Sequence, residues 1–212
     1  MTQSQDVPWR DWHEWYQMYE DPASITSQRL AVVRDWIRFS VEALPPGPVR
    51  VVSICSGDGR DLVGALTDHP RRPDVQGLLV EIDPGLAERG RATLWPGLDY
   101  LVGDAARTDN YVGAVPADLV LACGIFGNIS DDDIATTVRA MPAFLAPGGY
   151  VIWTRHRGEP DLVPAIDDWF ADAGFARVFV SDPDHPYGVG VHRLVTGPKP
   201  LPLGQRLFTF VR

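Results

Sequence analysis

From residue 49 onward, short apolar runs alternate with segments that carry helix signals, and this alternation is the strongest constraint on the fold. The runs are Val49–Cys55, Gly77–Ile82, Tyr100–Val102, Asp118–Cys123 and Tyr150–Thr154. Apolar strands separated by helices predict a parallel sheet that is covered by helices on both faces. Ligands of such sheets bind beyond the carboxyl ends of the strands. We therefore expect functional residues directly after these runs.

The segments between and after the runs complete this pattern. Helices are predicted over Gly59–Thr67, from Pro84, from Ser130 and over Asp161–Ala173. Proline suits the first position of a helix, and the hydroxyl of Ser130 can accept hydrogen bonds from free backbone amides. After the last helix, three further extended segments are predicted: Arg177–Val180, Val189–Val195 and Leu207–Val211.

Residues 1–48 precede the alternating pattern and are predicted to form a helical cap. We expect a short aromatic helix over Trp9–Glu20 and a second helix over Ser27–Leu44. In the second helix, apolar side chains recur at three- and four-residue steps, as they do on one face of a helix: Leu30, Val33, Ile37, Val41 and Leu44. The boundaries that we predict are a cap or lid over residues 1–48 and a ligand-binding domain over residues 49–212, packed as one structural unit.

Composition excludes several classes of function. The chain has 19 Lys and Arg against 28 Asp and Glu, a net charge of −9, which disfavours nucleic acid as a partner. Its apolar runs are far shorter than the ~20 residues of a membrane span, and its first residues lack a signal-peptide pattern. Two cysteines, Cys55 and Cys123, cannot form a disulfide framework, so we expect a cytoplasmic protein. No cluster has metal-ligand spacing, and we expect no metal.

Two elements near the first strands indicate a nucleotide-like ligand. Gly57 and Gly59 follow the first strand at the start of a helix, where they let the backbone approach a ligand closely. Glu81 ends the second strand, 22 residues after Gly59, where a carboxylate can accept from both hydroxyls of a ribose. Asp83 is an alternative for that role. Together these elements fit a nicotinamide site or an adenosylmethionine site, and glycines after strands are also common turn residues.

Three further segments distinguish between these ligands: Gly103–Ala105, Asp118–Cys123 and Leu145–Gly149. With them, the chain from Val49 to Val180 resembles the class I S-adenosylmethionine-dependent methyltransferases. The resemblance implies an α/β, Rossmann-like fold, with helices on both faces of a mostly parallel seven-stranded sheet in the order 3-2-1-4-5-7-6. It also implies S-adenosyl-L-methionine as the cofactor. The segments Cys55–Leu62, Cys123–Ile129 and Trp153–Arg157 are similar to a narrower group of uncharacterised actinobacterial methyltransferases.

The resemblance implies cofactor contacts after four of the strands, at Ser53, Cys55, Gly57, Gly59, Glu81, Ile82, Asp104, Ala105, Cys123 and Gly124. The loop after the first strand would hold the methionine end of the cofactor. Glu81 would bind the ribose, Asp104 would face the adenine amine, and the residues after the fourth strand would form the floor beneath the methionyl group. Ser53 stands where the family usually has an acid, and Cys55 where it usually has a glycine. Ser53 cannot supply a charge that pairs with the amino group.

Residues for the acceptor are expected after the later strands and on the cap. The candidates for a base or an orienting group are His13, Tyr16, Asn128 and His156. The candidates for acceptor binding are Trp12, Trp15, Tyr19, Phe126, Arg155 and Arg157. Two arginines in an acidic chain suit an anion, and aromatic faces attract a sulfonium or a flat acceptor. The plainer alternatives are arginines paired with Glu159, Asp161 or the acidic segment Asp131–Asp133, Asn128 bonded to its own backbone, and an aromatic stripe that packs on the sheet.

These features predict a methyltransferase that modifies an oxygen or nitrogen of a small molecule, anionic or aromatic, in specialised metabolism. Two alternatives stay open. The fold could use the same cofactor in a cyclisation, decarboxylation or rearrangement, or it could serve as a non-catalytic partner subunit, since a fold does not fix a reaction. A homodimer is also an open alternative.

Overall fold

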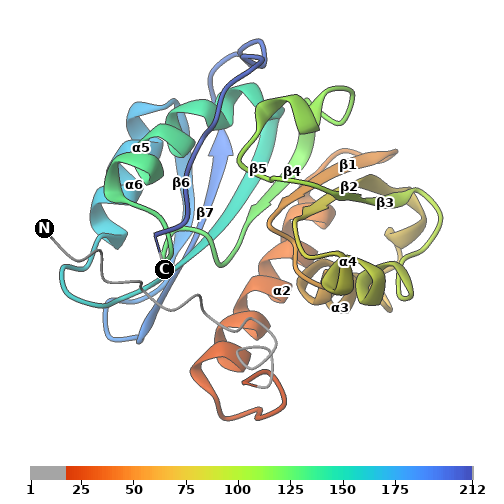
Figure 1. Cartoon of the computed structure of the whole chain (residues 1–212), viewed down its shortest axis with the longest axis horizontal. Coiled ribbons are helices and arrows are strands. Elements are labelled where there is room, and N and C mark those ends of the chain that lie inside the picture. The colour runs from red at the N-terminus through yellow and green to blue at the C-terminus, as the bar shows by residue number, and fades with distance from the viewer. Residues whose placement is uncertain (1–17, 212) are drawn as a thin grey trace, which may run out of the picture.

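One seven-stranded sheet organises the molecule, for which the computed structural model describes residues 18–211 (Figure 1). The strands are β1 Val49–Ile54, β2 Val75–Glu81, β3 Leu98–Val102, β4 Ala117–Ala122, β5 Leu145–His156, β6 Phe175–Val180 and β7 Tyr187–Leu194. Their order is β3-β2-β1-β4-β5-β7-β6, and β7 runs antiparallel to its neighbours β5 and β6. The predicted fold class and strand order are confirmed.

Helices cover both faces of this sheet. They are α2 Ile25–Ala43, α3 Arg60–Leu66, α4 Pro84–Arg91, α5 Asp131–Ala140 and α6 Val163–Asp172, with short 3-10 turns η1 Arg72–Asp74, η2 Thr108–Tyr111 and η3 Met141–Ala143. Figure 1 shows α5 and α6 on one side, and α2, α3 and α4 on the other. Alternate residues of the strands point to these two layers, so that Val51 and Val52 belong to different apolar clusters.

Two of the predicted helix starts, those of α4 and α5, are confirmed by their caps. Asp83 precedes α4, and its carboxylate accepts from the amides of Gly85 and Leu86, while Pro84 takes the first helical position. The hydroxyl of Ser130 accepts from the amide of Asp133 at 3.2 Å and begins α5. Both caps satisfy amides that have no partner within their own helix.

Most strands start or end within two residues of the prediction, and the first and the fifth show why the ends differ. The first strand ends at Ile54 because Cys55 adopts a left-handed backbone, with φ of 53°. The fifth strand is longer than expected, since it begins at Leu145 beside Ala117 and continues to His156, which pairs with Tyr187. Pairing with two neighbouring strands extends it beyond the apolar run on which the prediction depended.

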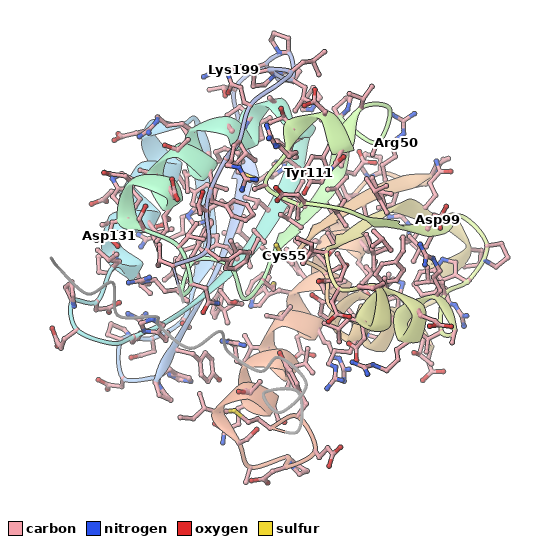
Figure 2. The ribbon with its side chains drawn as sticks, viewed as in Figure 1. Arg50, Cys55, Asp99, Tyr111, Asp131 and Lys199 are labelled. Atoms are coloured by element: carbon pink, nitrogen blue, oxygen red, sulfur yellow. The ribbon has the colours of Figure 1, made fainter. Side chains whose placement is uncertain are left out.

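The last segment of the chain, residues 195–211, leaves the sheet. Leu207–Val211 was predicted to be extended, and residues 206 and 210 form isolated bridges with Arg107 and Ile129. The amide of Leu207 donates to the carbonyl of Ala106 at 2.8 Å. Figure 2 shows Lys199 at the rim of the molecule, from which the chain returns toward its middle (Figure 1).

The N-terminal part is described from Met18. Most of the predicted aromatic helix, including Trp12, His13, Trp15 and Tyr16, lies outside the described residues. Residues 18–20 form a turn, and α2 agrees with the predicted second helix within two residues. None of the helices in residues 18–211 is both long and apolar enough to cross a membrane.

Candidate functional site

A cavity of about 680 Å³ opens at the carboxyl ends of β1, β2 and β4. At this edge β2 lies on one side of β1 and β4 on the other, so that the strand order switches sides here, and such a switch point is the usual ligand position in these sheets. Cys55, directly after β1, lies near the middle of the molecule in Figure 2. The volume falls in the ordinary range for small-molecule sites, roughly 300–1,000 Å³.

The loop from β1 to α3 forms one wall of the cavity. Three of its residues have left-handed backbones: Cys55 with φ of 53°, Gly57 with 57° and Gly59 with 70°. At Gly59 a Cβ atom would lie 2.7 Å from the hydroxyl of Tyr100, so that a larger residue would force the strand β3 side chain to move. The amide of Ser56 donates to the carbonyl of Val80 at 3.0 Å and fixes the loop against β2. The sharp turn therefore presents backbone to the cavity.

Glu81, at the end of β2, joins this loop to the next one. One carboxylate oxygen accepts from the amide of Gly57 at 2.8 Å, and the other accepts from the amide of Asp83 at 2.9 Å. The residue is 7% exposed and lines the cavity. Burial raises the pKa of this carboxyl group above its ordinary value, and the two amide hydrogen bonds oppose that shift. Glu81 is thus a positioned acceptor that also holds the loop.

The far side of the cavity is built around the end of β3. Asp104 accepts from the amide of Ala106 at 3.0 Å and forms an ion pair with Arg206 of the C-terminal segment. Ala105 is buried, whereas Ile82, after β2, is 67% exposed and lines the cavity. An exposed isoleucine at the rim of a concave site offers an apolar surface to a flat ligand.

Beneath the cavity, the end of β4 contacts β5. The amide of Gly124 donates to the hydroxyl of Thr154 at 2.8 Å, and all three of Cys123, Gly124 and Thr154 line the cavity. Burial raises the pKa of the thiols of Cys55 and Cys123 well above the ordinary value, so both stay protonated at neutral pH. They are free thiols that fill space at the cavity floor.

Most residues expected to contact the cofactor therefore come together. Those that line the cavity are Cys55, Gly57, Glu81, Ile82, Asp104, Ala105, Cys123 and Gly124. Gly59 and Ser53 are not among the lining residues: Gly59 precedes α3, and Ser53 is buried within β1.

The residues expected to bind an acceptor are more dispersed. Tyr19 lines the cavity, and the guanidinium of Arg60 lies 4.4 Å from the centre of its ring. Phe126 is fully buried in the apolar cluster below α5 and α6 and is not a lining residue. Asn128 is buried, and its side-chain amide donates to the carbonyl of Gly124 at 2.7 Å, as in the plainer alternative.

The cluster at the end of β5 consists of Arg155, His156 and Arg157, and none of the three lines the cavity. The guanidinium of Arg155 donates to the carbonyl of Phe126. His156 accepts from the amide of Gly158 at 3.0 Å. Arg157 donates to Asp161 at 2.5 Å and to the carbonyl of Ser181 at 2.7 Å. Arg157 thus adopts the ion pair with Asp161 that the sequence offered as the alternative to anion binding.

The structure also places residues at the cavity that the sequence analysis did not select. Some come from the N-terminal helices, namely Arg29, Leu30, Val33 and Asp61, and others from the C-terminal segment, namely Arg206, Phe208, Thr209 and Phe210. Asp61 directly follows the glycine loop, and that proximity was a usable signal. The C-terminal residues had no comparable signal, because their approach depends on tertiary contacts between residues about one hundred positions apart, such as Thr108 with Gln205.

Asp61 is the most perturbed carboxyl group of this site. It is 9% exposed on the first turn of α3, and its side chain accepts from the amide of Leu62 at 2.7 Å. Burial raises its pKa to about 6, Asp58 adds to the shift, and Arg34 opposes it. Perturbed carboxyl groups in a cavity are frequent at functional sites. In residues 18–211 no group of three or more His, Cys, Asp and Glu side chains is arranged to hold a metal ion.

Similarity to solved structures agrees with the fold. Magnesium protoporphyrin IX methyltransferase from Synechocystis, with S-adenosylmethionine bound, matches at a TM-score of 0.62 and 11% identity, over 86% of this chain and 90% of that one. A TehB-like S-adenosylmethionine-dependent methyltransferase from Corynebacterium glutamicum matches at 0.57 and 14% identity, over 89% and 97%. An O-methyltransferase family protein from Burkholderia thailandensis matches at 0.59 and 17% identity, over 87% of this chain, which spans 63% of that protein.

These similarities show that the chain has the Rossmann-like methyltransferase fold. No family model matches the sequence, and no curated protein matches it.

Proposed function

We propose that this protein binds S-adenosyl-L-methionine in the cavity at the carboxyl edge of the sheet and transfers its methyl group to an oxygen or nitrogen of a small molecule. Glu81 is the observation that carries the proposal. Its carboxylate is held at the end of β2 by two backbone amides and lines the cavity, which is the position from which an acid can bind a ribose.

The residues around Glu81 fit the remaining parts of this cofactor. On the side of β3, Ile82 offers an apolar surface and Asp104 an acceptor, as an adenine ring and its amine require. On the side of α3, Cys55 and Gly57 present a narrow loop to the methionine end. The similarity to methyltransferase structures, one of them with S-adenosylmethionine bound, supports the same assignment.

The chain's own residues have to hold the acceptor beside the cofactor. When bound, the cofactor supplies an electrophilic methyl group on a sulfonium, so that catalysis depends mainly on orientation. Among residues 18–211, three aromatic side chains line the cavity: Tyr19, Phe208 and Phe210. Aromatic rings suit a flat acceptor and a sulfonium charge, and this supports an aromatic substrate. Arg29 lines the same cavity and supports an anionic group on it.

The N-terminal residues 1–48 belong to this proposal as part of the acceptor site. The support comes from their described members, because Tyr19, Arg29, Leu30 and Val33 line the cavity, while Ile37 packs in the apolar core. The roles of His13 and Tyr16 as base or orienting group stay predictions, as they lie outside the described residues.

Calorimetric titration of the full chain with S-adenosylmethionine and with S-adenosylhomocysteine tests the proposal. We expect both to bind with micromolar dissociation constants, and Glu81→Ala to weaken both strongly. If neither compound binds, the cofactor assignment is contradicted. Release of S-adenosylhomocysteine in the presence of an acceptor then separates methyl transfer from a reaction that keeps the cofactor intact, because only methyl transfer produces it.

A further inference from the structure

We infer that Asp61 binds the ammonium group of the cofactor's methionine end, with Arg29 facing the carboxylate of the same end. This inference rests on the proposed function and adds to it the part of the site that recognises an amino acid. It assigns to α3 the negative charge that Ser53, an uncharged residue buried in β1, cannot supply.

The position of Asp61 is the first support. It lies on the first turn of α3, directly after the glycine loop that faces the methionine end, and it lines the same cavity as Cys55 and Gly57. Burial raises the pKa of the Cys123 thiol and of the Tyr100 hydroxyl, and the nearby charge of Asp61 adds to both shifts. Asp61 and Cys123, which belongs to the cavity floor, line the same cavity, so that a ligand in this space would contact both.

The surroundings of Asp61 are the second support. It is nine-tenths buried, yet no ion pair joins it to a cationic side chain in the described part of the chain. The neighbouring guanidiniums are directed to other acceptors. Arg34 donates to the carbonyl of Arg60 at 3.0 and 2.6 Å, and Arg60 itself donates to Asp58 at 2.9 Å. A buried carboxylate is costly unless a cation accompanies it, and an incoming ammonium group would be such a cation.

Arg29 provides the opposite charge at the same end. It lines the cavity from α2, and its hydrogen bond with the hydroxyl of Tyr19 lowers the pKa of that group, against the larger effect of burial. The charge of Arg29 also reaches Cys123, as the charge of Asp61 does. The carboxylate on α3 and the guanidinium on α2, two helices in contact with each other, line one cavity and form a site complementary to a zwitterion, which carries one charge of each sign.

Two ligands separate this inference from the cofactor proposal. S-Adenosylhomocysteine carries the amino-acid end, whereas 5′-methylthioadenosine shares the adenosine and the sulfur but lacks that end. We expect Asp61→Asn to lower the affinity for S-adenosylhomocysteine by about tenfold to a hundredfold, the range for a hydrogen bond to a charged group. The affinity for 5′-methylthioadenosine should stay unchanged. Arg29→Met should show the same selectivity. Asp35→Asn, which removes an exposed carboxylate from α2, is the matched control and should affect neither ligand.

Each outcome of these titrations supports or overturns the role of Asp61. Selective loss of S-adenosylhomocysteine affinity in Asp61→Asn supports the inference. Equal loss for both ligands, or no loss for either, overturns it while the cofactor proposal stands, because the wild-type protein still binds. Failure of the wild-type protein to bind either ligand overturns the cofactor proposal and this inference with it.

Discussion

The substitution Asp61→Asn is expected to make the ligand-free protein more stable at neutral pH. Burial raises the pKa of Asp61 from an ordinary value of 3.8 to about 6. One pKa unit corresponds to ~1.4 kcal/mol, so the shift of roughly two units costs the folded state about 3 kcal/mol once the group is charged. Asparagine retains the shape and an oxygen that can accept from Leu62, without the charge.

The pH dependence follows from proton binding. Because the pKa of the folded state is raised, folded Asp61 keeps its proton up to about pH 6, whereas the unfolded residue loses it near its ordinary pKa of 3.8. Between these values the folded state binds more protons, and stability falls as the pH rises. The variant leaves the charged and titratable groups around position 61 in place, namely Asp58, Arg34, Arg29, Arg60 and Tyr100. The gain from asparagine should therefore be small below the unfolded pKa and reach its full size above pH 6.

Urea unfolding of the ligand-free protein at about pH 4 and about pH 7 measures this gain. The variant should be more stable than the wild type at the higher pH by up to about 3 kcal/mol, and the difference should shrink at the lower pH. Asp35→Asn controls for the change in net charge. A variant that is no more stable at neutral pH, or a gain that does not depend on pH, would refute the reasoning about Asp61.

Three further substitutions test other parts of the site. Glu81→Gln should lower the affinity for S-adenosylhomocysteine by about 10- to 150-fold, since a hydrogen bond to a charged acceptor contributes roughly 1.5–3 kcal/mol. An affinity that calorimetry finds unchanged would reject the ribose assignment. Phe208→Ala should lower the free energy of unfolding by about 3–5 kcal/mol, because the ring is 1% exposed. The same substitution should also lower the affinity for S-adenosylhomocysteine. A loss of stability below about 1 kcal/mol would show that the C-terminal segment is not packed as described. Arg157→Met should lower stability by about 1–3 kcal/mol through the lost contacts with Asp161 and Ser181, and leave ligand affinity unchanged, so that a tenfold loss of affinity would restore Arg157 to the site.

The fold could be predicted from the sequence because its signals are local. Apolar runs such as Val49–Cys55 and caps such as Ser130 report the environment of their own segment, and the strand order followed from the resemblance that these motifs carry. The cofactor side of the cavity could be predicted for the same reason. In a parallel sheet the residues after β1, β2 and β4 meet at one edge, so that Cys55, Glu81 and Cys123 had to come together.

The rest of the site depends on contacts that local patterns do not encode. Arg155 lies near the end of β5 and Arg157 directly follows it, yet their long side chains reach the carbonyls of Phe126 and Ser181. Phe208 joins the cavity because the chain returns from the rim after β7, and nothing near residue 208 indicates that path. Asp61 was visible in the sequence, but only the structure shows that it is buried and that no cationic side chain of residues 18–211 forms an ion pair with it.

A crystal structure of the full chain with S-adenosylhomocysteine would test the central claim most directly. The account predicts that the ligand fills the cavity, with its ribose hydroxyls within hydrogen-bond distance of the Glu81 carboxylate, its adenine beside Ile82 and Asp104, and its ammonium group on Asp61. A ligand bound at another place, or a cavity that stays empty at saturating ligand, would contradict it.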